Sequence, residues 1–322
     1  MSGSGRAVLV GDVGGTNARF ALARRTEAGF SLERHQSFPA EQVPSFLEAV
    51  RAFIDGCEDT PTGGVLAVAG PVIDGEVDLT NSPWRISEAE LVRLGQGSIR
   101  LINDFEALAW GAPLVPVDEL ARLGGPDRGS PNAALAVVGP GTGFGVSTLA
   151  RDARGREIAL PAEGGHISFA PTDDVEDEIL RILRARFGRV SVERLICGPG
   201  LVTLHGVLAQ IEGRRAELTE PAAITAQALD DSASHAAATL TRFCGILGAV
   251  AGDIALITGA RGGVYVAGGI APRILPFLQA SPFRARFDGK GRYEAYMKAI
   301  PTRVILHKHA ALLGAARVAF TP

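Results

Sequence analysis

The sequence contains little cysteine, little lysine and no surplus of positive charge. Only three cysteines occur among its 322 residues. They form no CxxC pair, so neither a zinc knuckle nor a dithiol redox site is expected, and such sparse thiols are typical of the reducing cytoplasm. The 32 basic and 35 acidic residues leave a net charge of −3. Because nucleic acids and anionic membrane surfaces are recognised by a basic excess, we expect no nucleic-acid partner and no membrane partner.

Long apolar runs and common catalytic motifs are also missing. The longest apolar stretch, 243–257, is interrupted by Asp253 and is shorter than the ~18–20 residues of a membrane span. The first residues lack the charged and apolar pattern of a signal peptide. No Walker-type loop (GxxxxGK followed by Ser or Thr) and no HExxH motif occurs, which argues against a P-loop ATPase and a zinc metalloprotease.

What is present is a regular alternation of short strand-like runs and helical patterns. Two segments, 7–23 and 134–149, have the pattern of β-hairpins around a glycine-rich turn. Further strands are predicted at 64–69, 98–102 and 263–267, and helices at 44–56, from about 105, at 234–257 and at 308–320. Such alternation predicts an α/β fold.

The length and the last helix predict two domains. A chain of this length holds about two domains at ~100–200 residues each. The segment 308–320 is apolar nearly all round, so we expect it to be buried and to return to the N-terminal half. With 114–131 as the crossing, we predict a small α/β domain of 1–113 plus 305–322 and a large one of 114–304. The two glycine hairpins suggest related halves, and two unrelated hairpins are the alternative.

The two glycine turns are candidates for phosphate binding. Glycine lets a backbone turn approach an anion closely, so that its N–H groups become donors. In the first turn a carboxylate ends a strand, and we expect this residue, Asp12, to hold Mg²⁺ through water. An ordinary β-turn is the alternative for each. The predicted nucleotide-binding positions are Gly11, Asp12, Val13, Gly14, Gly15, Thr16 and Asn17 in the first turn and Gly141, Thr142 and Gly143 in the second.

Asn103 and Asp104 stand where a strand-like run meets a helical pattern. There Asp104 can accept a proton from a substrate hydroxyl, which is the role of a carboxylate base in phosphoryl transfer, and Asn103 can fix a neighbouring hydroxyl. Both residue types also cap helices routinely, which is the structural alternative.

Glu163 and His166, in the sequence EGGH, form a candidate sugar site. A carboxylate accepts hydrogen bonds and an imidazole donates or accepts them, which suits the vicinal hydroxyls of a sugar. A turn with a surface salt bridge is the alternative. On its own, Glu193 is most simply placed at the positive end of a helix, and Asn81 is most simply a turn residue.

The glycine pair Gly268 and Gly269 follows the strand at 263–267 and precedes a helical pattern with Pro272 in its first turn. A glycine pair at such a point offers a flat backbone platform for an adenine ring or a ribose.

Taken in order, these segments resemble the hexokinase/actin-like ATPase superfamily, and within it the bacterial glucokinase family. The resemblance covers nearly the whole chain. It rests on seven segments: 11–22 (GDVGGTNARFAL), 79–84 (LTNSPW), 102–107 (INDFEA), 139–145 (GPGTGFG), 163–166 (EGGH), 193–201 (ERLICGPGL) and 266–273 (VAGGIAPR).

The resemblance implies an actin-like (ribonuclease H-like) ATPase fold of two α/β domains with a cleft between them. It implies ATP-dependent phosphorylation of D-glucose to glucose 6-phosphate, with ATP and Mg²⁺ as cofactors. The glycine turns would bind phosphate and Gly268–Gly269 the adenosine. The residues implied around glucose are Asn81, Asn103, Asp104, Glu163, His166 and Glu193, with Asp104 as the base on the 6-hydroxyl. Members of this family are usually cytoplasmic homodimers.

One difference separates the chain from the related ROK sugar kinases. Those enzymes carry a zinc-binding cysteine cluster after their EGGH-like histidine, whereas this sequence has no cysteine between His166 and Cys197. We therefore expect a member outside the ROK group and no zinc. A kinase for another hexose or amino sugar is the alternative enzyme, and a non-catalytic sugar sensor of the same fold is the alternative from another class.

Overall fold

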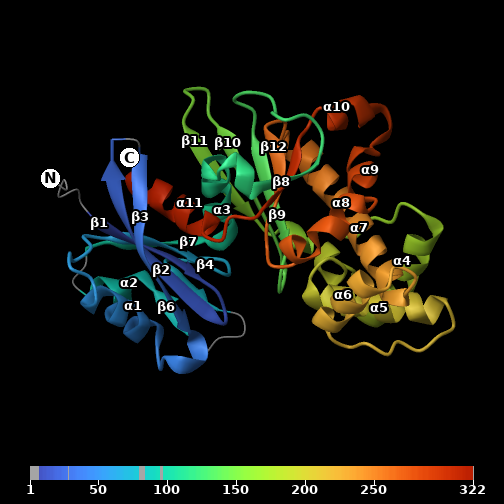
Figure 1. Cartoon of the computed structure of the whole chain (residues 1–322), viewed down its shortest axis with the longest axis horizontal. Helices are drawn as coiled ribbons and strands as arrows, with labels where there is room; N and C mark the ends of the chain where they lie inside the picture. Colours follow the sequence, from blue (N-terminus) through green and yellow to red (C-terminus); the bar gives the residue numbers. More distant parts are fainter. Residues whose placement is uncertain (1–6, 28, 80–83, 95–96, 322) are drawn as a thin grey trace. The chain divides into compact units, whose positions relative to one another are not determined.

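The computed structural model describes residues 7–27, 29–79, 84–94 and 97–321 (Figure 1). The chain divides into two compact units. Unit 1 comprises Met1–Pro116 and His307–Pro322, and unit 2 comprises Val117–Leu306. Both units contain a sheet and helices, which confirms the predicted α/β class.

Unit 1 is built around a five-stranded sheet. Its strands are β1 (Ala7–Val13), β2 (Asn17–Thr26), β3 (Gly29–Pro39), β4 (Gly64–Val68) and β7 (Ile99–Asn103), with a small separate sheet of β5 (Glu76–Asp78) and β6 (Arg85–Ser87). Its helices are α1 (Phe46–Asp55), α2 (Glu88–Val92), α3 (Asp104–Gly111) and α11 (Ala310–Phe320), with 3₁₀ turns at Ala40–Gln42 and Ala112–Leu114.

The strand order in this sheet is β3-β2-β1-β4-β7. The predicted hairpin is present, since β1 and β2 pair antiparallel from Ala7 opposite Arg24 to Val13 opposite Ala18. The strands β4 and β7 then run parallel to β1, so the ends of β1 and β7 come out at the same edge of the sheet. This edge carries the first glycine turn and the start of α3.

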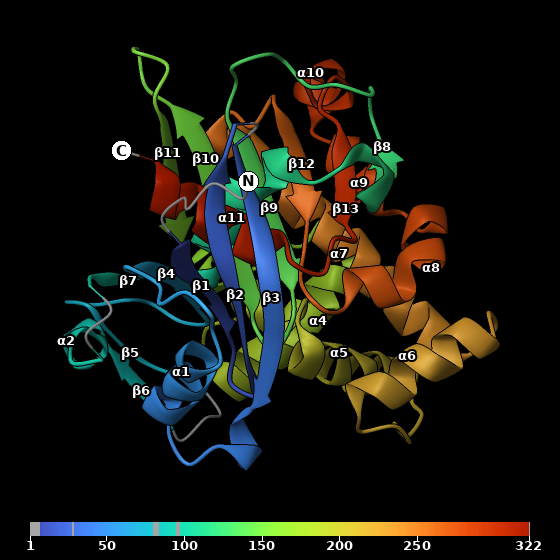
Figure 2. The same ribbon diagram turned by 60° about the vertical axis from the view of Figure 1, so that its left-hand side comes forward.

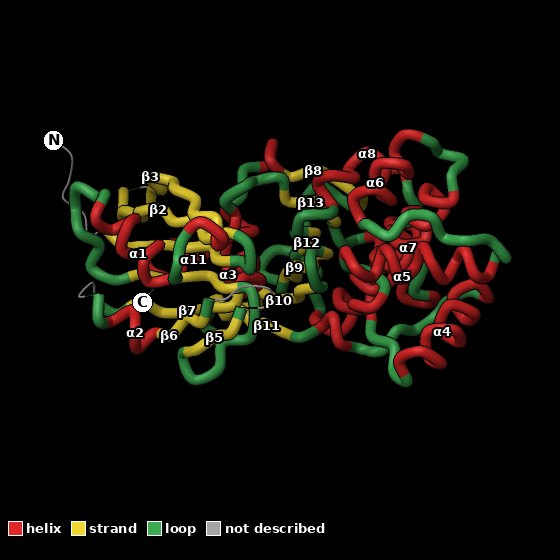
Figure 3. Tube along the Cα trace, turned by 90° about the horizontal axis from the view of Figure 1, so that it is seen from below, coloured by secondary structure: helices red, strands yellow, loops and turns green. Residues whose placement is uncertain are grey.

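The C-terminal helix α11 packs in unit 1, as predicted from its apolar sequence. It lies against α3, β1 and β4, so the first and last parts of the chain meet (Figures 1 and 3). Two glycines allow this close crossing. A Cβ at Gly111 would collide with the backbone of Ala310, and one at Gly314 would collide with the backbone of Ala107. The position of α3 therefore depends on α11.

Unit 2 is built around a six-stranded sheet (Figure 2). Its strands are β8 (Leu120–Gly124), β9 (Leu135–Pro140), β10 (Phe144–Arg151), β11 (Glu157–Ala162), β12 (Gly263–Val266) and β13 (Thr302–Ile305). Its α-helices are α4 (Asp174–Phe187), α5 (Gly198–Ile211), α6 (Pro221–Asp230), α7 (His235–Thr258), α8 (Leu275–Ala280), α9 (Phe283–Asp288) and α10 (Glu294–Lys298). Its 3₁₀ turns are Val117–Glu119, Gly164–His166, Val192–Arg194, Ala271–Ile274 and Gly291–Tyr293.

The strand order in the second sheet is β11-β10-β9-β12-β13-β8. The strands β9 and β10 form the second predicted hairpin, and β12 and β13 run parallel to β9. Two details differ from the sequence prediction. The stretch 114–131, expected only as a crossing, also supplies the edge strand β8, and the helix expected after the glycine pair begins as a 3₁₀ turn.

The long helix α7 forms the centre of the core of unit 2. Ser234 caps its first turn by accepting from the N–H of Ala237, and Gly259 ends it in the left-handed conformation. By length and composition α7 could cross a membrane, but 72% of its most apolar window is buried inside the structure. It packs against α5, α6 and α9, which gather on one side of the sheet (Figure 1).

Candidate active site

The first glycine turn connects β1 to β2 in unit 1. The N–H of Gly14 donates to the carbonyl of Asn17 and closes the turn. Among the described residues, the N–H groups of Gly15 and Thr16 have no hydrogen-bond partner, so both can donate to an anion. The Asn17 amide is used locally, because its Nδ2 donates to Thr16 Oγ1 at 3.2 Å.

Gly11 and Val13, which the prediction also assigned to the nucleotide, lie buried inside β1. Gly11 is needed there for packing, because a Cβ would lie 2.6 Å from a methyl group of Leu66. The structure therefore places these two residues under the turn rather than at its tip.

Asp12 faces Arg19 across the hairpin. The two residues are register partners, and Arg19 Nη1 lies 3.0 Å from Asp12 Oδ2. A side-chain carboxylate at the end of this strand fits the oxygen preference of Mg²⁺. Within the described ranges no group of three or more His, Cys, Asp or Glu side chains could cage a metal ion. These residues fit an ion that brings further oxygen ligands from a nucleotide and from water.

Asn103 and Asp104 lie at the junction of β7 and α3. Asn103 is the N-cap, since its Oδ1 accepts from the N–H groups of Phe105 and Glu106. Its Nδ2 donates to the carbonyl of Gly70. The capping alternative therefore holds for Asn103, whose oxygen serves the helix.

Asp104 is the first helical residue, and its Oδ1 accepts from the N–H of Phe105 at 2.9 Å. The side chain is partly exposed. The N-cap of α3 is Asn103, and Asp104 adds a contact to the N–H of Phe105. The positive N-terminus of α3 stabilises a negative charge at this position.

The second glycine turn connects β9 to β10 in unit 2. The N–H of Gly141 donates to the carbonyl of Gly143, and Thr142 at the tip is exposed. In the described part of the chain, the N–H groups of Thr142 and Gly143 have no hydrogen-bond partner and are available to phosphate. The turn is held from outside by Gly198, whose N–H donates to the carbonyl of Gly141 at 2.8 Å.

The EGGH segment follows β11. Gly164–His166 forms a 3₁₀ turn in which the N–H of His166 donates to the carbonyl of Glu163. The side chains of Glu163 and His166 are both exposed, and Gly165 is buried. Arg189 supports this turn by donating to the carbonyl of His166.

Glu193 brings the EGGH segment and the glycine turn together. It lies in the 3₁₀ turn Val192–Arg194, where its Oε2 accepts from the N–H of Phe144 at 2.8 Å. Its Oε1 lies 3.9 Å from Nδ1 of His166. Glu193 and His166 border a pocket of about 450 Å³ in unit 2. The lining residues are Thr142, His166, Arg189, Ser191, Glu193, Arg194, Cys197, Pro199, Gly200 and Thr203.

Sequence reasoning did not assign Cys197 or Arg189 to this site. Cys197 is the N-cap of α5, where its Sγ accepts from the N–H of Gly200 and donates to the carbonyl of Glu193. Burial raises the pKa of this thiol to about 11, so it stays protonated and unreactive. Its place directly before a Gly-Pro helix start was a usable capping signal. No comparable signal pointed to Arg189.

The glycine pair lies beside the second turn. Gly268 has φ +82°, and a Cβ there would lie 2.5 Å from the carbonyl oxygen of Pro140. The N–H of Ile270 donates to the same carbonyl at 3.4 Å. The proposed adenosine segment and phosphate turn are therefore neighbours in unit 2. Asn81 lies outside the described residues.

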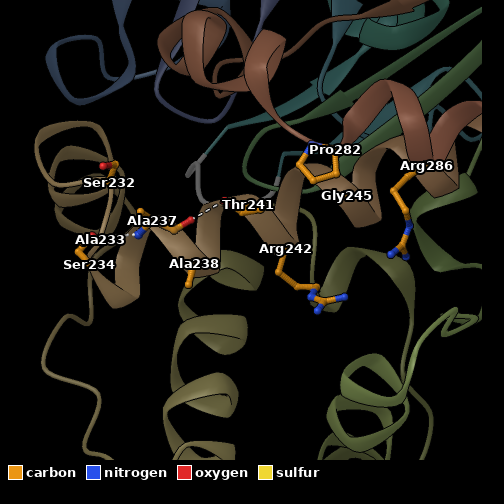
Figure 4. Close-up of a pocket in the computed structure, with 10 residues that line it drawn as sticks. All are labelled: Ser232, Ala233, Ser234, Ala237, Ala238, Thr241, Arg242, Gly245, Pro282 and Arg286. Atoms are coloured by element: carbon orange, nitrogen blue, oxygen red, sulfur yellow. Dashed lines mark hydrogen bonds between the residues drawn. The ribbon is translucent and has the colours of Figure 1, made fainter.

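A second pocket, of about 400 Å³, follows α7 but contains no predicted site residue (Figure 4). Arg242 and Arg286 project toward it. Both are engaged by the buried Glu176, whose Oε1 lies 3.1 Å from Arg242 Nη1 and 2.6 Å from Arg286 Nη2. Asp173 also pairs with both arginines. The charges of the two carboxylates and the two guanidinium groups balance. Because Glu176 lies in α4, Arg242 in α7 and Arg286 in α9, these ion pairs connect the three helices.

The profile of the glucokinase family matches residues 9–321 of the chain. A curated glucokinase from Caulobacter vibrioides is 50% identical over 99% of this chain and 96% of its own length. The chain belongs to the glucokinase family. It is an enzyme whose activity is the ATP-dependent phosphorylation of glucose, as the resemblance implied.

Solved structures agree with this assignment. The crystal structure of a glucokinase from an Antarctic psychrotroph superposes with a TM-score of 0.89 at 36% identity, and covers 97% of this chain and 98% of that one. A ROK-family glucokinase from Streptomyces griseus, solved with glucose and AMPPNP, superposes with a TM-score of 0.63 at 19% identity over 97% and 98% of the two chains. At that identity the second likeness shows the fold alone, which is the predicted actin-like sugar-kinase fold.

Proposed function

We propose that Asp104 is the base that accepts the proton of the glucose 6-hydroxyl during phosphoryl transfer. The supporting observation is its place as the first residue of α3, directly after β7, where the neighbouring Asn103 supplies the capping oxygen of the helix. The N-terminus of α3 favours a negative charge at this position, and a carboxylate base accepts a proton in its ionised form.

The two glycine turns are proposed to hold the phosphates of ATP. Each turn offers two N–H groups without a partner in the described structure, at Gly15 and Thr16 and at Thr142 and Gly143. Donors fixed in advance stabilise the charge that develops on the transferred phosphoryl group. Mg²⁺, when bound beside Asp12, would neutralise part of the phosphate charge.

The sugar is proposed to bind beside the pocket of unit 2, in contact with His166 and Glu193. Glu163 lies on the same segment as His166, and the resemblance implies Asn81, Asn103 and Asp104 of unit 1 as further sugar contacts. The mixed donors and acceptors suit vicinal hydroxyls, whereas a nucleic acid or a protein partner would need a broader surface. The Gly268–Gly269 segment is proposed to carry the adenosine.

We further propose that the two units correspond to the small and large domains of the enzyme, and that it acts as a cytoplasmic homodimer without zinc. Metal analysis of the purified protein and its mass in solution test the last two points. Stoichiometric zinc, with activity lost on its removal, would contradict the absence of zinc. A fully active monomer would contradict the homodimer.

One assay tests the substrate assignment. Formation of sugar phosphate is measured with glucose, mannose, fructose and N-acetylated amino sugars, each with ATP, ADP and polyphosphate as donors. Glucose with Mg-ATP is expected to give the highest kcat/KM. A higher kcat/KM for another hexose would favour the alternative kinase, and no sugar-dependent ADP release by folded protein would contradict the enzyme assignment itself.

A further inference from the structure

The carboxylate of Glu193 is packed between the nucleotide-binding turn and the EGGH segment of unit 2. Its Oε2 accepts from the N–H of Phe144, the first residue after the turn. A Cβ at Gly143 would lie 2.6 Å from this oxygen, and a Cβ at Gly165 would lie 3.2 Å from it. Glycine at both positions therefore lets one carboxylate touch two backbone segments that are far apart in the sequence.

The chain that follows Glu193 holds the other side of the same turn. The N–H of Gly198 donates to the carbonyl of Gly141. Cys197 fixes this segment internally, because its Sγ donates to the carbonyl of Glu193 at 3.0 Å and its helix α5 begins at the next residue. The segment 193–198 thus forms hydrogen bonds with the turn on both sides of its exposed tip at Thr142, with Gly141 before it and with Phe144 after it.

The second oxygen of Glu193 lies near His166, and both residues line the pocket of unit 2. Oε1 lies 3.9 Å from His166 Nδ1, and 32% of the Glu193 side chain is exposed, so part of this side chain is open to a ligand in the pocket. Building on the proposed function, we infer that Glu193 is a positioning residue that couples sugar binding to the conformation of the nucleotide-binding turn. A hydroxyl bound at Oε1 fixes the carboxylate, and Oε2 then fixes the N–H of Phe144.

The expected coupling is positive and reciprocal. A carboxylate that accepts from a backbone N–H makes a charge-assisted bond, which is stronger than a neutral one. When glucose restrains the Glu193 carboxylate further, the turn that its Oε2 holds has less freedom left to lose when the nucleotide binds. Couplings of this kind usually change affinity by about 5- to 150-fold, and the same factor must apply to glucose when nucleotide binds first.

Calorimetry measures this coupling directly. The Kd of AMPPNP with Mg²⁺ is determined with and without saturating glucose, and the ratio of the two values is the coupling factor. We expect a ratio of at least about 5 in the natural protein. Glu193→Gln is expected to bring it close to 1, because an amide has a single acceptor oxygen for which the turn and the sugar compete.

Glu163→Gln is the matched control. It removes a charge from the same sugar site without touching Phe144, so glucose should bind more weakly while the coupling factor stays as in the natural protein. If Glu193 were only a sugar ligand, Glu193→Gln would behave like this control, and that result would overturn the inference. A natural protein without coupling would overturn it as well.

A second variant and a second readout test the coupling independently, in case Glu193→Gln does not fold. Gly143→Ala should displace the carboxylate through its new methyl group and also lower the coupling factor. Hydrogen–deuterium exchange of peptides spanning 140–146 should slow when glucose alone is added to the natural protein, and not in Glu193→Gln. Equal slowing in both would contradict the coupling. A protein that binds no glucose at all would instead refute the proposed function.

Discussion

The two units share the same sheet plan but use it differently. In unit 1 an antiparallel meander, β3-β2-β1, continues into the parallel strands β4 and β7, and in unit 2 the meander β11-β10-β9 continues into β12 and β13. In each meander the glycine turn connects the first two strands in sequence, β1 to β2 and β9 to β10. The shared plan supports two related halves, as the sequence suggested, over two unrelated hairpins.

The difference lies in what surrounds each turn. In unit 1 the neighbouring side chains are charged, with Asp12 paired to Arg19 and Asp104 at the start of α3. In unit 2 the turn is tied down, by Glu193 on one side and by the backbone of Gly198 on the other. We therefore propose that unit 1 supplies the chemical groups of the reaction and that unit 2 positions the substrates. The predictions below test this division.

The largest effect is expected at Asp104. Asp104→Asn keeps the shape of the side chain but cannot take a proton, so kcat should fall by about 10²–10⁴-fold while glucose still binds. Asp174→Asn is the control, because Asp174 is the first residue of α4 as Asp104 is of α3. It should leave kcat unchanged. A near-normal kcat for Asp104→Asn would remove this residue from the mechanism.

Substitutions of the EGGH segment should act on binding rather than on chemistry. Glu163→Gln and His166→Ala each leave a sugar hydroxyl without its partner, at a cost of about 1–3 kcal/mol. The KM for glucose should therefore rise by roughly 5- to 150-fold, with a smaller change in the KM for ATP. If the glucose KM is unchanged in both variants, EGGH is an ordinary surface turn.

Alanine in place of glycine should have opposite effects on stability at one position in each unit. Gly314→Ala forces α11 away from α3 and should lower the free energy of unfolding by about 1–3 kcal/mol. Gly206→Ala, in the middle of α5, meets nothing within 4 Å and should raise it by up to about 1 kcal/mol, because alanine is the better helix former. Urea denaturation measures both. A stable Gly314→Ala protein would show that the crossing can relax.

Asp12→Ala should weaken Mg-ATP more than glucose. Loss of a carboxylate beside the proposed ion should raise the KM for Mg-ATP by roughly tenfold, which corresponds to about 1.4 kcal/mol. Kinetics at varied Mg²⁺ measure it. Loss of glucose binding with unchanged nucleotide affinity would mean that the assignment of this turn is wrong.

The smallest effect concerns acid stability in unit 2. Burial and the nearby His235 lower the pKa of His205. Thr239 Oγ1 donates to the carbonyl of His235, so it accepts from the Nδ1–H of a neutral His205. The unfolded state then binds more protons, and stability should fall as the pH drops below about 6.5. Melting temperatures should depend less on pH in His205→Asn, and an unchanged slope would contradict this.

Most of the fold could be predicted from patterns that extend over only a few residues of the sequence. Apolar runs and glycine turns located both hairpins, α1, α7 and the returning helix α11, because burial and turn geometry act over a few residues. The strand β8 was missed, since LARLG is short and only partly buried at the edge of a sheet. The parts of the site fixed by distant contacts could not be foreseen. Nothing near Glu193 in the sequence shows that its carboxylate meets Phe144, 49 residues away.

The division between the units is tested most directly by the pH dependence of kcat/KM for glucose, which reports ionisation of the essential base. The natural protein and Glu163→Gln should both lose activity on the acid side as the base becomes protonated. Asp104→Asn has no such group, so its residual activity should be independent of pH across that range. An acid limb that persists in Asp104→Asn would show that another group takes the proton, and would contradict the assignment of the base to unit 1.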